Sequence, residues 1–237
     1  MKQPFFRILI PALLLSMVFG CRSVTPAVTH YVLNSMAAGE SPSETVDEPR
    51  SRIIAIGPVR LPNYVNRMQM VIRNSSSELE ISEFHRWADY PDRLVQQVLE
   101  DNLQVLLPRS RVVSHPLPAG LKPDVTVTVR FGEWIGTADK KVRLRATWTV
   151  RSEGEPATER SWQTRISEPI EGTGFKDLAA AHSRALEKLC RDIALALRAR
   201  AKITSHFESR CIPPACVVKM RHIPNMPIIF TPCRLGA

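Results

Sequence analysis

The chain has 237 residues, of which 44% are hydrophobic, so it can bury a substantial core. Its formal net charge is +9 at pH 7, but part of that excess lies at the N-terminus and beyond residue 201. The charge is not accompanied by a basic helix or by interleaved basic and aromatic residues, which argues against a nucleic-acid-binding protein.

The N-terminal segment has the layout of a bacterial lipoprotein signal. Two basic residues precede an almost wholly apolar run at 8–19, and residues 18–21 read Val-Phe-Gly-Cys. The run is shorter than the roughly 20 residues that a bilayer requires and has the length of a secretory signal. We predict a signal peptide over 1–20 and acylation of Cys21 by a diacylglycerol and an N-acyl chain such as palmitate. An ordinary secreted protein and an uncleaved anchor are the alternatives.

Short strands and turns are predicted for the next part of the chain. Residues 21–29 form a tether that reaches at most about 30 Å. Apolar runs predict strands at 30–33 and 53–56, with a loop rich in Ser, Glu and Pro between them.

Two prolines then predict a turn or extended bend around residues 61–64. Period-two alternation predicts a hairpin of strands at 68–73 and 79–84. The same alternation places His85 on a solvated face, which argues against an acid–base role with Glu83 or Asp89.

Longer elements are predicted for the second half. Pro91 opens a helix whose apolar residues recur at helical spacing until Pro108. Alternating residues predict long strands at 125–131 and 142–150 and a third strand at 162–164, and a long helix follows over 175–201. The order strands, helix, strands, helix predicts one layered α/β domain over residues 30–201, with a mixed, largely antiparallel sheet packed by two main helices.

Residues 202–237 differ abruptly in composition, with five prolines, three cysteines and no regular period. We predict an irregular, poorly ordered tail. Cys211, Cys216, His222 and Cys233 are residue types that bind zinc, but they lack the short Cys-x-x-Cys spacing of zinc knuckles. A disulfide between two of the three cysteines is the favoured alternative in an oxidising compartment.

The sequence contains no pattern that predicts catalysis. It lacks a nucleophile elbow, a His-Glu-x-x-His helix and a glycine-rich phosphate loop. His182 falls on the apolar stripe of the last helix, where a packed side chain is expected, and the body offers no partner for Cys190. We therefore expect no enzyme activity, no metal and no cofactor beyond the acyl chains on Cys21.

Residues 56–73 read Ile-Gly-Pro-Val-Arg-Leu-Pro-Asn-Tyr-Val-Asn-Arg-Met-Gln-Met-Val-Ile-Arg. This segment resembles the signature of the PqiC/YmbA-type lipoproteins, the ABC-type transport auxiliary lipoprotein components. Tyr31-x-Leu33, Phe84-x-x-Trp87-Ala88 and residues 99–108 resemble further family motifs in the same order. The resemblance covers roughly residues 31–201.

The resemblance implies a non-enzymatic accessory subunit of an MCE (mammalian cell entry) system, which moves lipid between the inner and outer membranes. The implied partners are an MCE-domain protein and inner-membrane transporter subunits, with a possible homo-oligomer and no nucleic acid. Arg22 favours the periplasmic face of the outer membrane, because aspartate at that position is the usual inner-membrane retention signal.

Two functional hypotheses remain open from the sequence. In the first, the protein docks to its partner through Arg60, Asn63, Tyr64 and Arg67, since Tyr and Arg are enriched at binding hot spots. The same four residues would otherwise fix a turn inside the fold. In the second hypothesis, the domain itself carries or senses lipid, which an apolar pocket of several hundred Å³ would favour.

Overall fold

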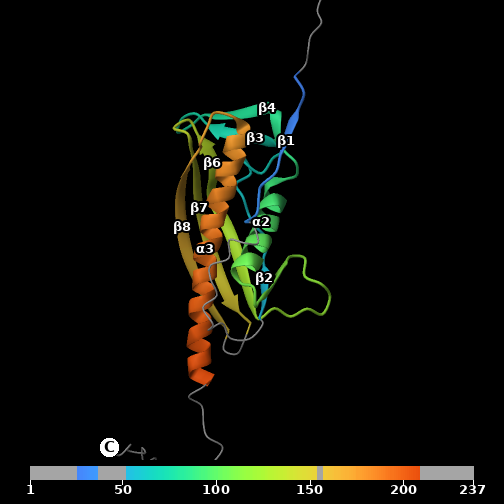
Figure 1. Ribbon diagram of the computed structural model, residues 1–237, viewed down its shortest axis with the longest axis vertical. Coiled ribbons are helices and arrows are strands. Elements are labelled where there is room, and N and C mark those ends of the chain that lie inside the picture. Colours follow the sequence, from blue (N-terminus) through green and yellow to red (C-terminus); the bar gives the residue numbers. More distant parts are fainter. Residues whose placement is uncertain (1–25, 37–51, 154–156, 209–237) are drawn as a thin grey trace, which may run out of the picture.

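The computed structural model describes residues 26–36, 52–153 and 157–208. Helices α2 (Pro91–Leu106) and α3 (Phe175–Glu208) lie on one face of an eight-stranded sheet (Figure 1). The strands are β1 (Thr29–Tyr31), β2 (Ile53–Ile56), β3 (Gln69–Arg73), β4 (Leu79–Trp87), β5 (Arg111–Ser114), β6 (Val125–Thr137), β7 (Lys141–Ser152) and β8 (Thr158–Pro169). The predicted mixed α/β layer with two main helices is confirmed.

The sheet is built around the long strand β6. Along one edge β6 pairs with the antiparallel β7, which in turn pairs with β8. Along the other edge lie β2 beside the start of β6 and β3 beside its end, both parallel to it. β4 pairs antiparallel with β3, and β1 and β5 complete the order β1-β4-β3-β6-β2-β5.

The core lies between the helices and one face of the sheet. Alternate residues of β6 and β7 are buried because successive side chains of a strand point to opposite faces. They meet the apolar stripe of α3, which recurs at helical spacing as predicted. The buried members of that stripe are Leu178, His182, Ala185, Leu186, Leu189, Ile193 and Leu197.

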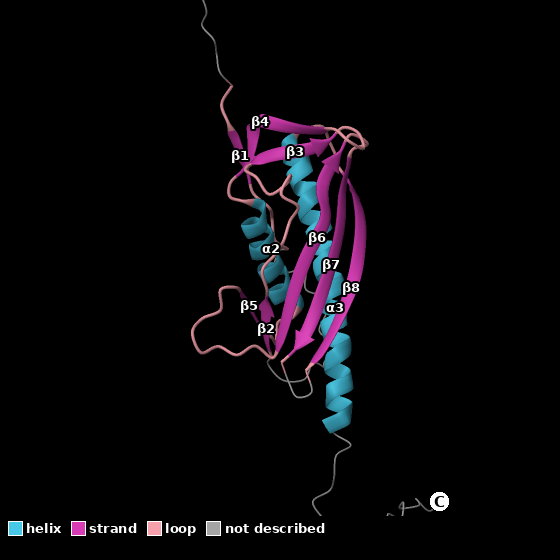
Figure 2. Cartoon of the chain, turned by 180° about the vertical axis from the view of Figure 1, so that it is seen from behind, coloured by secondary structure: helices cyan, strands magenta, loops and turns pink. Residues whose placement is uncertain are grey.

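The opposite face of β6, β7 and β8 is called the outer face here. Figure 2 looks onto it and shows no described helix across it. Threonines and charged side chains alternate with the core residues on β6 and β7, so most of this face is exposed. The molecule therefore has one helix-covered face and one open, polar face.

Several boundaries differ from the sequence prediction. β6 runs through a register shift between Phe131 and Glu133 and is longer than predicted. β5 was not predicted, because its four residues are too short for a clear period. Helix α3 continues to Glu208 and so includes the first residues assigned to the tail. Cys21, Cys211, Cys216 and Cys233 lie outside the described residues.

The first described segment is tied to both helices. Leu33 and Met36 are buried, and the Met36 N–H donates to Oδ1 of Asn102 on α2 at 2.7 Å. The Asn34 N–H donates to Oγ of Ser183 on α3 at 3.0 Å. Asn102, which lies within the family motif at 99–108, therefore satisfies a buried backbone group that would otherwise be costly to desolvate.

Candidate docking surface

The segment between β2 and β3 is held by β6 before it leaves the sheet. The Gly57 N–H donates to the Val127 carbonyl at 2.7 Å, and the Arg60 N–H donates to the Val129 carbonyl at 3.1 Å. A Cβ on Gly57 would lie 2.7 Å from Cγ2 of Thr128, so this close approach requires glycine. Residues 61–68 then loop outward beside the register shift of β6.

This loop covers a small apolar cluster separate from the main core. Val65, Val71 and Ile135 are buried together, and Leu61 and Tyr64 pack against them. Val71 points away from the side occupied by Met70, which belongs to the main core. Part of the segment at residues 58–73, which runs from the end of β2 through β3, therefore has a packing role.

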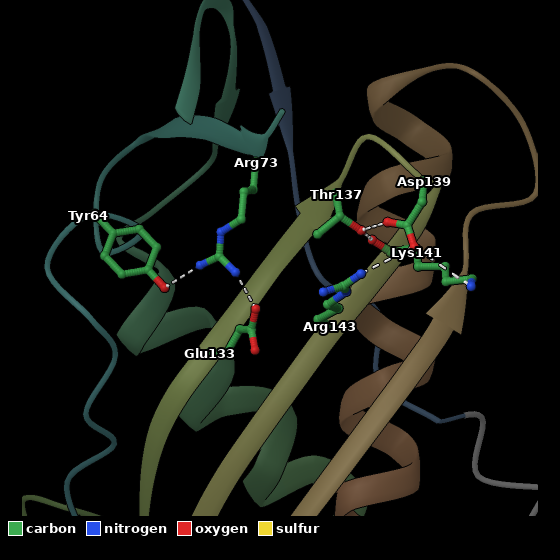
Figure 3. A network of polar contacts seen from close by, with 7 residues as sticks. All are labelled: Tyr64, Arg73, Glu133, Thr137, Asp139, Lys141 and Arg143. Carbon is green, nitrogen blue, oxygen red and sulfur yellow. Dashed lines mark hydrogen bonds and ion pairs between the residues drawn. The ribbon is translucent and has the colours of Figure 1, made fainter. Parts of the chain in front are cut away.

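A polar network joins the loop to the sheet (Figure 3). The Arg73 guanidinium lies between two partners: it donates to the Tyr64 hydroxyl at 3.2 Å and forms an ion pair with Glu133. The side chains of Arg73 and Glu133 are 25% and 19% exposed, so the pair is partly shielded from solvent. Sequence reasoning did not assign Glu133, because the pairing depends on the register of β3 against β6.

The loop also supports the start of helix α2. Tyr90 occupies the N-cap position and provides no side-chain hydrogen bond to the first turn. Oδ1 of Asn66 accepts the Asp92 N–H at 3.2 Å instead, and Nδ2 of Asn66 donates to Oδ2 of Asp92 at 3.2 Å. Asn66 thus satisfies one of the free N–H groups that every helix start leaves.

The four predicted contact residues divide into two pairs. Arg60 and Asn63 are exposed. Tyr64 is half-buried and bonded to Arg73, and Arg67 is half-buried with an Nε that has no hydrogen-bond partner in the described part of the chain. The outward pair is free to meet a partner, whereas Tyr64 already contributes to the fold.

A second network stabilises the turn between β6 and β7 (Figure 3). Asp139 accepts a hydrogen bond from Thr137 and lies 3.3 Å from Nη2 of Arg143 and 3.7 Å from Nζ of Lys141. The Thr137 hydrogen bond, followed by the bond and charge of Arg143, lowers the pKa of Asp139 despite a partly opposing effect of burial. This carboxylate is therefore ionised at neutral pH and already engaged by its neighbours.

His85 does not lie on a solvated face, so that prediction was wrong. Its ring stacks on Phe175 with centroids 4.0 Å apart, and the Tyr31 hydroxyl lies 2.9 Å from its Nδ1. The alternation failed because β4 bulges beside β3. Gln69 and Val71, two residues apart on β3, pair with Arg86 and Ile81, which are five residues apart on β4. The three extra residues on β4 reverse the face on which its side chains lie. His85 has a packing role between β1, β4 and the start of α3.

His182 and Trp87 are packed inside the core. The Trp87 ring lies 5.6 Å from His182 and 5.5 Å from Trp134 between ring centroids. These contacts place Trp87 against α3 and β6. Burial lowers the pKa of His182 to about 3, so its imidazole is neutral at physiological pH.

Cys190 is a buried free thiol. Burial raises its pKa to about 12, which the hydrogen bond from Nδ2 of Asn102, 3.7 Å from Sγ, does not overcome. A thiol with such a pKa is a poor nucleophile, because the thiolate is the reactive form.

Two cavities flank the ends of β6, β7 and β8. One, of about 200 Å³, is mainly apolar and is lined by residues that include Ile72, Ile170, Phe175 and Leu178. The other, of about 590 Å³, is an open basin on the outer face with arginines and a lysine in its lining. Ligand pockets typically occupy about 300–1,000 Å³ and bury most of their ligand, so the apolar cavity is small for a lipid.

Two further properties concern the described residues alone. They contain no group of three or more His, Cys, Asp or Glu side chains placed to hold a metal ion. Their helices include none that is both long and apolar enough to span a bilayer.

Comparison with known families decides the class of protein. The family model described as ABC-type transport auxiliary lipoprotein component matches residues 31–194. The chain belongs to this family. The match begins at the last residue of β1 and includes the 58–73 segment, the outer face and most of α3. The predicted resemblance is thereby confirmed. A search of curated proteins gives no match.

Two solved structures share the fold of this chain, and a third is more distantly similar. Protein XCC0632 from Xanthomonas campestris, of the DUF330 family, is 12% identical with a TM-score of 0.58, and the match covers 77% of this chain and 99% of that one. A crystal structure of an uncharacterized protein is 19% identical with a TM-score of 0.58, covering 73% and 99%. A PelC dodecamer from Paraburkholderia phytofirmans is 9% identical with a TM-score of 0.37, covering 60% and 90%.

Proposed function

We propose that this auxiliary lipoprotein is anchored through Cys21 to the periplasmic face of the outer membrane and docks to an MCE-domain protein of an intermembrane lipid transport system. The family assignment carries the transport role. The lipoprotein signal supports the anchor, and no cofactor is required beyond its acyl chains.

The environments of the candidate catalytic groups favour docking over chemistry. His85 is stacked on Phe175, His182 is a buried neutral imidazole, and Cys190 is a buried thiol with a pKa of about 12. General acid–base and nucleophilic catalysis need groups that reach substrate in a suitable protonation state. The exposed side chains of Arg60 and Asn63 support a docking role for the 58–73 segment.

The lipid-binding alternative receives less support. The apolar cavity at the start of α3 has about 200 Å³, below the several hundred Å³ that would favour a lipid carrier. An accessory subunit that binds protein therefore explains the described residues better than a carrier that encloses an acyl chain.

The proposal is tested by measuring affinity for a purified MCE-domain protein from the same organism. The probe is the soluble chain with Cys21→Ser, and the variants are the double change Arg60→Ala with Asn63→Ala and a control, Lys122→Ala, at an exposed loop position. We expect the double variant to bind about tenfold more weakly, equivalent to about 1.4 kcal/mol, and the control to bind normally.

Thermal unfolding separates docking from folding. Arg60 and Asn63 are exposed, so their loss should change stability by no more than about 0.5 kcal/mol. Wild-type affinity in a folded double variant would remove Arg60 and Asn63 from the docking surface. Failure of the unmodified domain to bind the MCE-domain protein would contradict the proposed function itself.

A further inference from the structure

The outer face carries a concentration of positive charge that its own carboxylates do not balance. Its exposed cations lie on β6, β7, β8 and the segment before β3. They are Arg60, Arg130, Lys141, Arg143, Arg145, Arg151 and Arg165. Four acidic side chains lie among these seven cations. Glu133 pairs with Arg73, and Asp139 pairs with Lys141 and Arg143. At the far end of the face Glu153 pairs with Arg151, and Glu159 on β8 lies opposite Arg151.

Four of the arginines are arranged as two pairs of like charge. Arg145 on β7 lies directly opposite Arg165 on β8, and Arg60 is bridged in parallel to Arg130 on β6. Within the described residues, none of these four has a carboxylate within ion-pair distance. Like charges directly opposite one another destabilise a sheet, so the fold gains nothing electrostatically from these neighbours.

The side chains between the arginine pairs are small or polar. Thr147 separates Arg130 from Gln163 across the sheet, and Thr149 faces Ser161. Among the described residues, no helix covers this face (Figure 2). The arrangement is a broad, polar, cationic surface, which suits an opposing surface rich in carboxylates.

The position of the N-terminal anchor indicates whether the outer face meets a protein partner or the membrane. β1 and the β6–β7 turn lie at one end of the molecule and the last turns of α3 at the other (Figure 1). Between Cys21 and Pro26 the chain reaches at most about 18 Å, so the end with β1 faces the membrane. Arg145 lies about 13 Å along the strand from Lys141, and Arg130 about 23 Å from Thr137.

The charges therefore extend away from the membrane along the face, where lipid headgroups would not reach most of them. Resting on the proposed function, we propose that the outer face of β6, β7 and β8 binds an acidic surface of the MCE-domain protein. Arg145 and Arg165 form the centre of this contact, and Arg60 and Arg130 extend it toward the 58–73 segment.

The test uses the Cys21→Ser chain and the purified MCE-domain protein. The double variant Arg145→Gln with Arg165→Gln should bind at least about tenfold more weakly than wild type, while its unfolding temperature stays equal or rises because the like-charge repulsion is gone. The control, Arg93→Gln with Lys122→Gln, removes the same charge from exposed positions outside the face and should bind normally. Wild-type affinity should also fall as salt rises to about 0.5 M.

Each contrary result has a distinct meaning. Unchanged binding by the Arg145/Arg165 variant, with wild type binding well, overturns this inference and leaves the proposed function standing. If the control variant loses the same affinity, the loss reflects net charge alone and the inference is overturned. An Arg145/Arg165 variant that unfolds at a lower temperature than wild type also overturns the inference. Loss of binding to phosphatidylglycerol vesicles, with binding to the MCE-domain protein retained, assigns the face to lipid instead. Failure of the wild-type chain to bind the MCE-domain protein refutes both this inference and the proposed function.

Discussion

Replacing Glu168 with glutamine tests how strongly the edge strand β8 is held to helix α3. Glu168 is 4% exposed and accepts hydrogen bonds from Nε of Arg184 at 2.7 Å and from Nζ of Lys188 at 2.6 Å. Burial alone would raise the pKa of this carboxyl, but the hydrogen bonds and charges of Lys188 and Arg184 together lower it.

The expected loss of unfolding free energy in Glu168→Gln is the balance of two opposing contributions. Hydrogen bonds to charged groups contribute about 1.5–3 kcal/mol each, but desolvation of the carboxylate offsets much of that. The Arg184 and Lys188 side chains are 34% and 56% exposed, so solvent screens them. We expect Glu168→Gln to cost about 1–2 kcal/mol at pH 7, which lowers the unfolding temperature by about 2–8 °C in a domain of this size.

The pH dependence gives a second readout. Because the folded-state pKa of Glu168 is lowered from 4.5, its stabilisation is present above that value and is lost as pH falls through the folded pKa. The difference between wild type and Glu168→Gln in thermal unfolding should therefore shrink in acid. Glu159→Gln on the exposed part of β8 is the control. Equal stability at pH 7, or a gap that persists in acid, would refute the reasoning.

Three further outcomes are expected. Cys21→Ser should move the protein from the membrane to the soluble periplasmic fraction, and a variant that still pellets with membranes would contradict the lipoprotein prediction. Cys190, in a chain whose other cysteines are serine, should react with a thiol reagent at pH 8 only on unfolding, since a pKa of about 12 leaves about one thiolate in ten thousand. Fast labelling of the folded chain would show that the site opens. Truncation after Glu208 should leave the unfolding temperature within a few degrees, because the buried stripe of α3 described here ends at Leu197; loss of folded protein would show that the tail packs.

Much of the secondary structure could be predicted from the sequence, because it depends on residues only a few positions apart. The alternation of Val125, Val127 and Val129 predicted β6, and the stripe of α3 placed His182 in the core. The ordered motifs at 56–73 and 99–108 pointed to the family. Periodicity of this kind follows directly from the geometry of one strand or one helix.

The register between strands and the packing between distant elements could not be predicted from the sequence in this way. Extra residues in β4 turn His85 toward Phe175, and β7 against β8 brings Arg145 opposite Arg165. Pairing between strands is a property of two segments together, and a shift of one residue exchanges every face. The charge pattern of the outer face therefore follows from the assembled sheet and not from any single stretch of sequence.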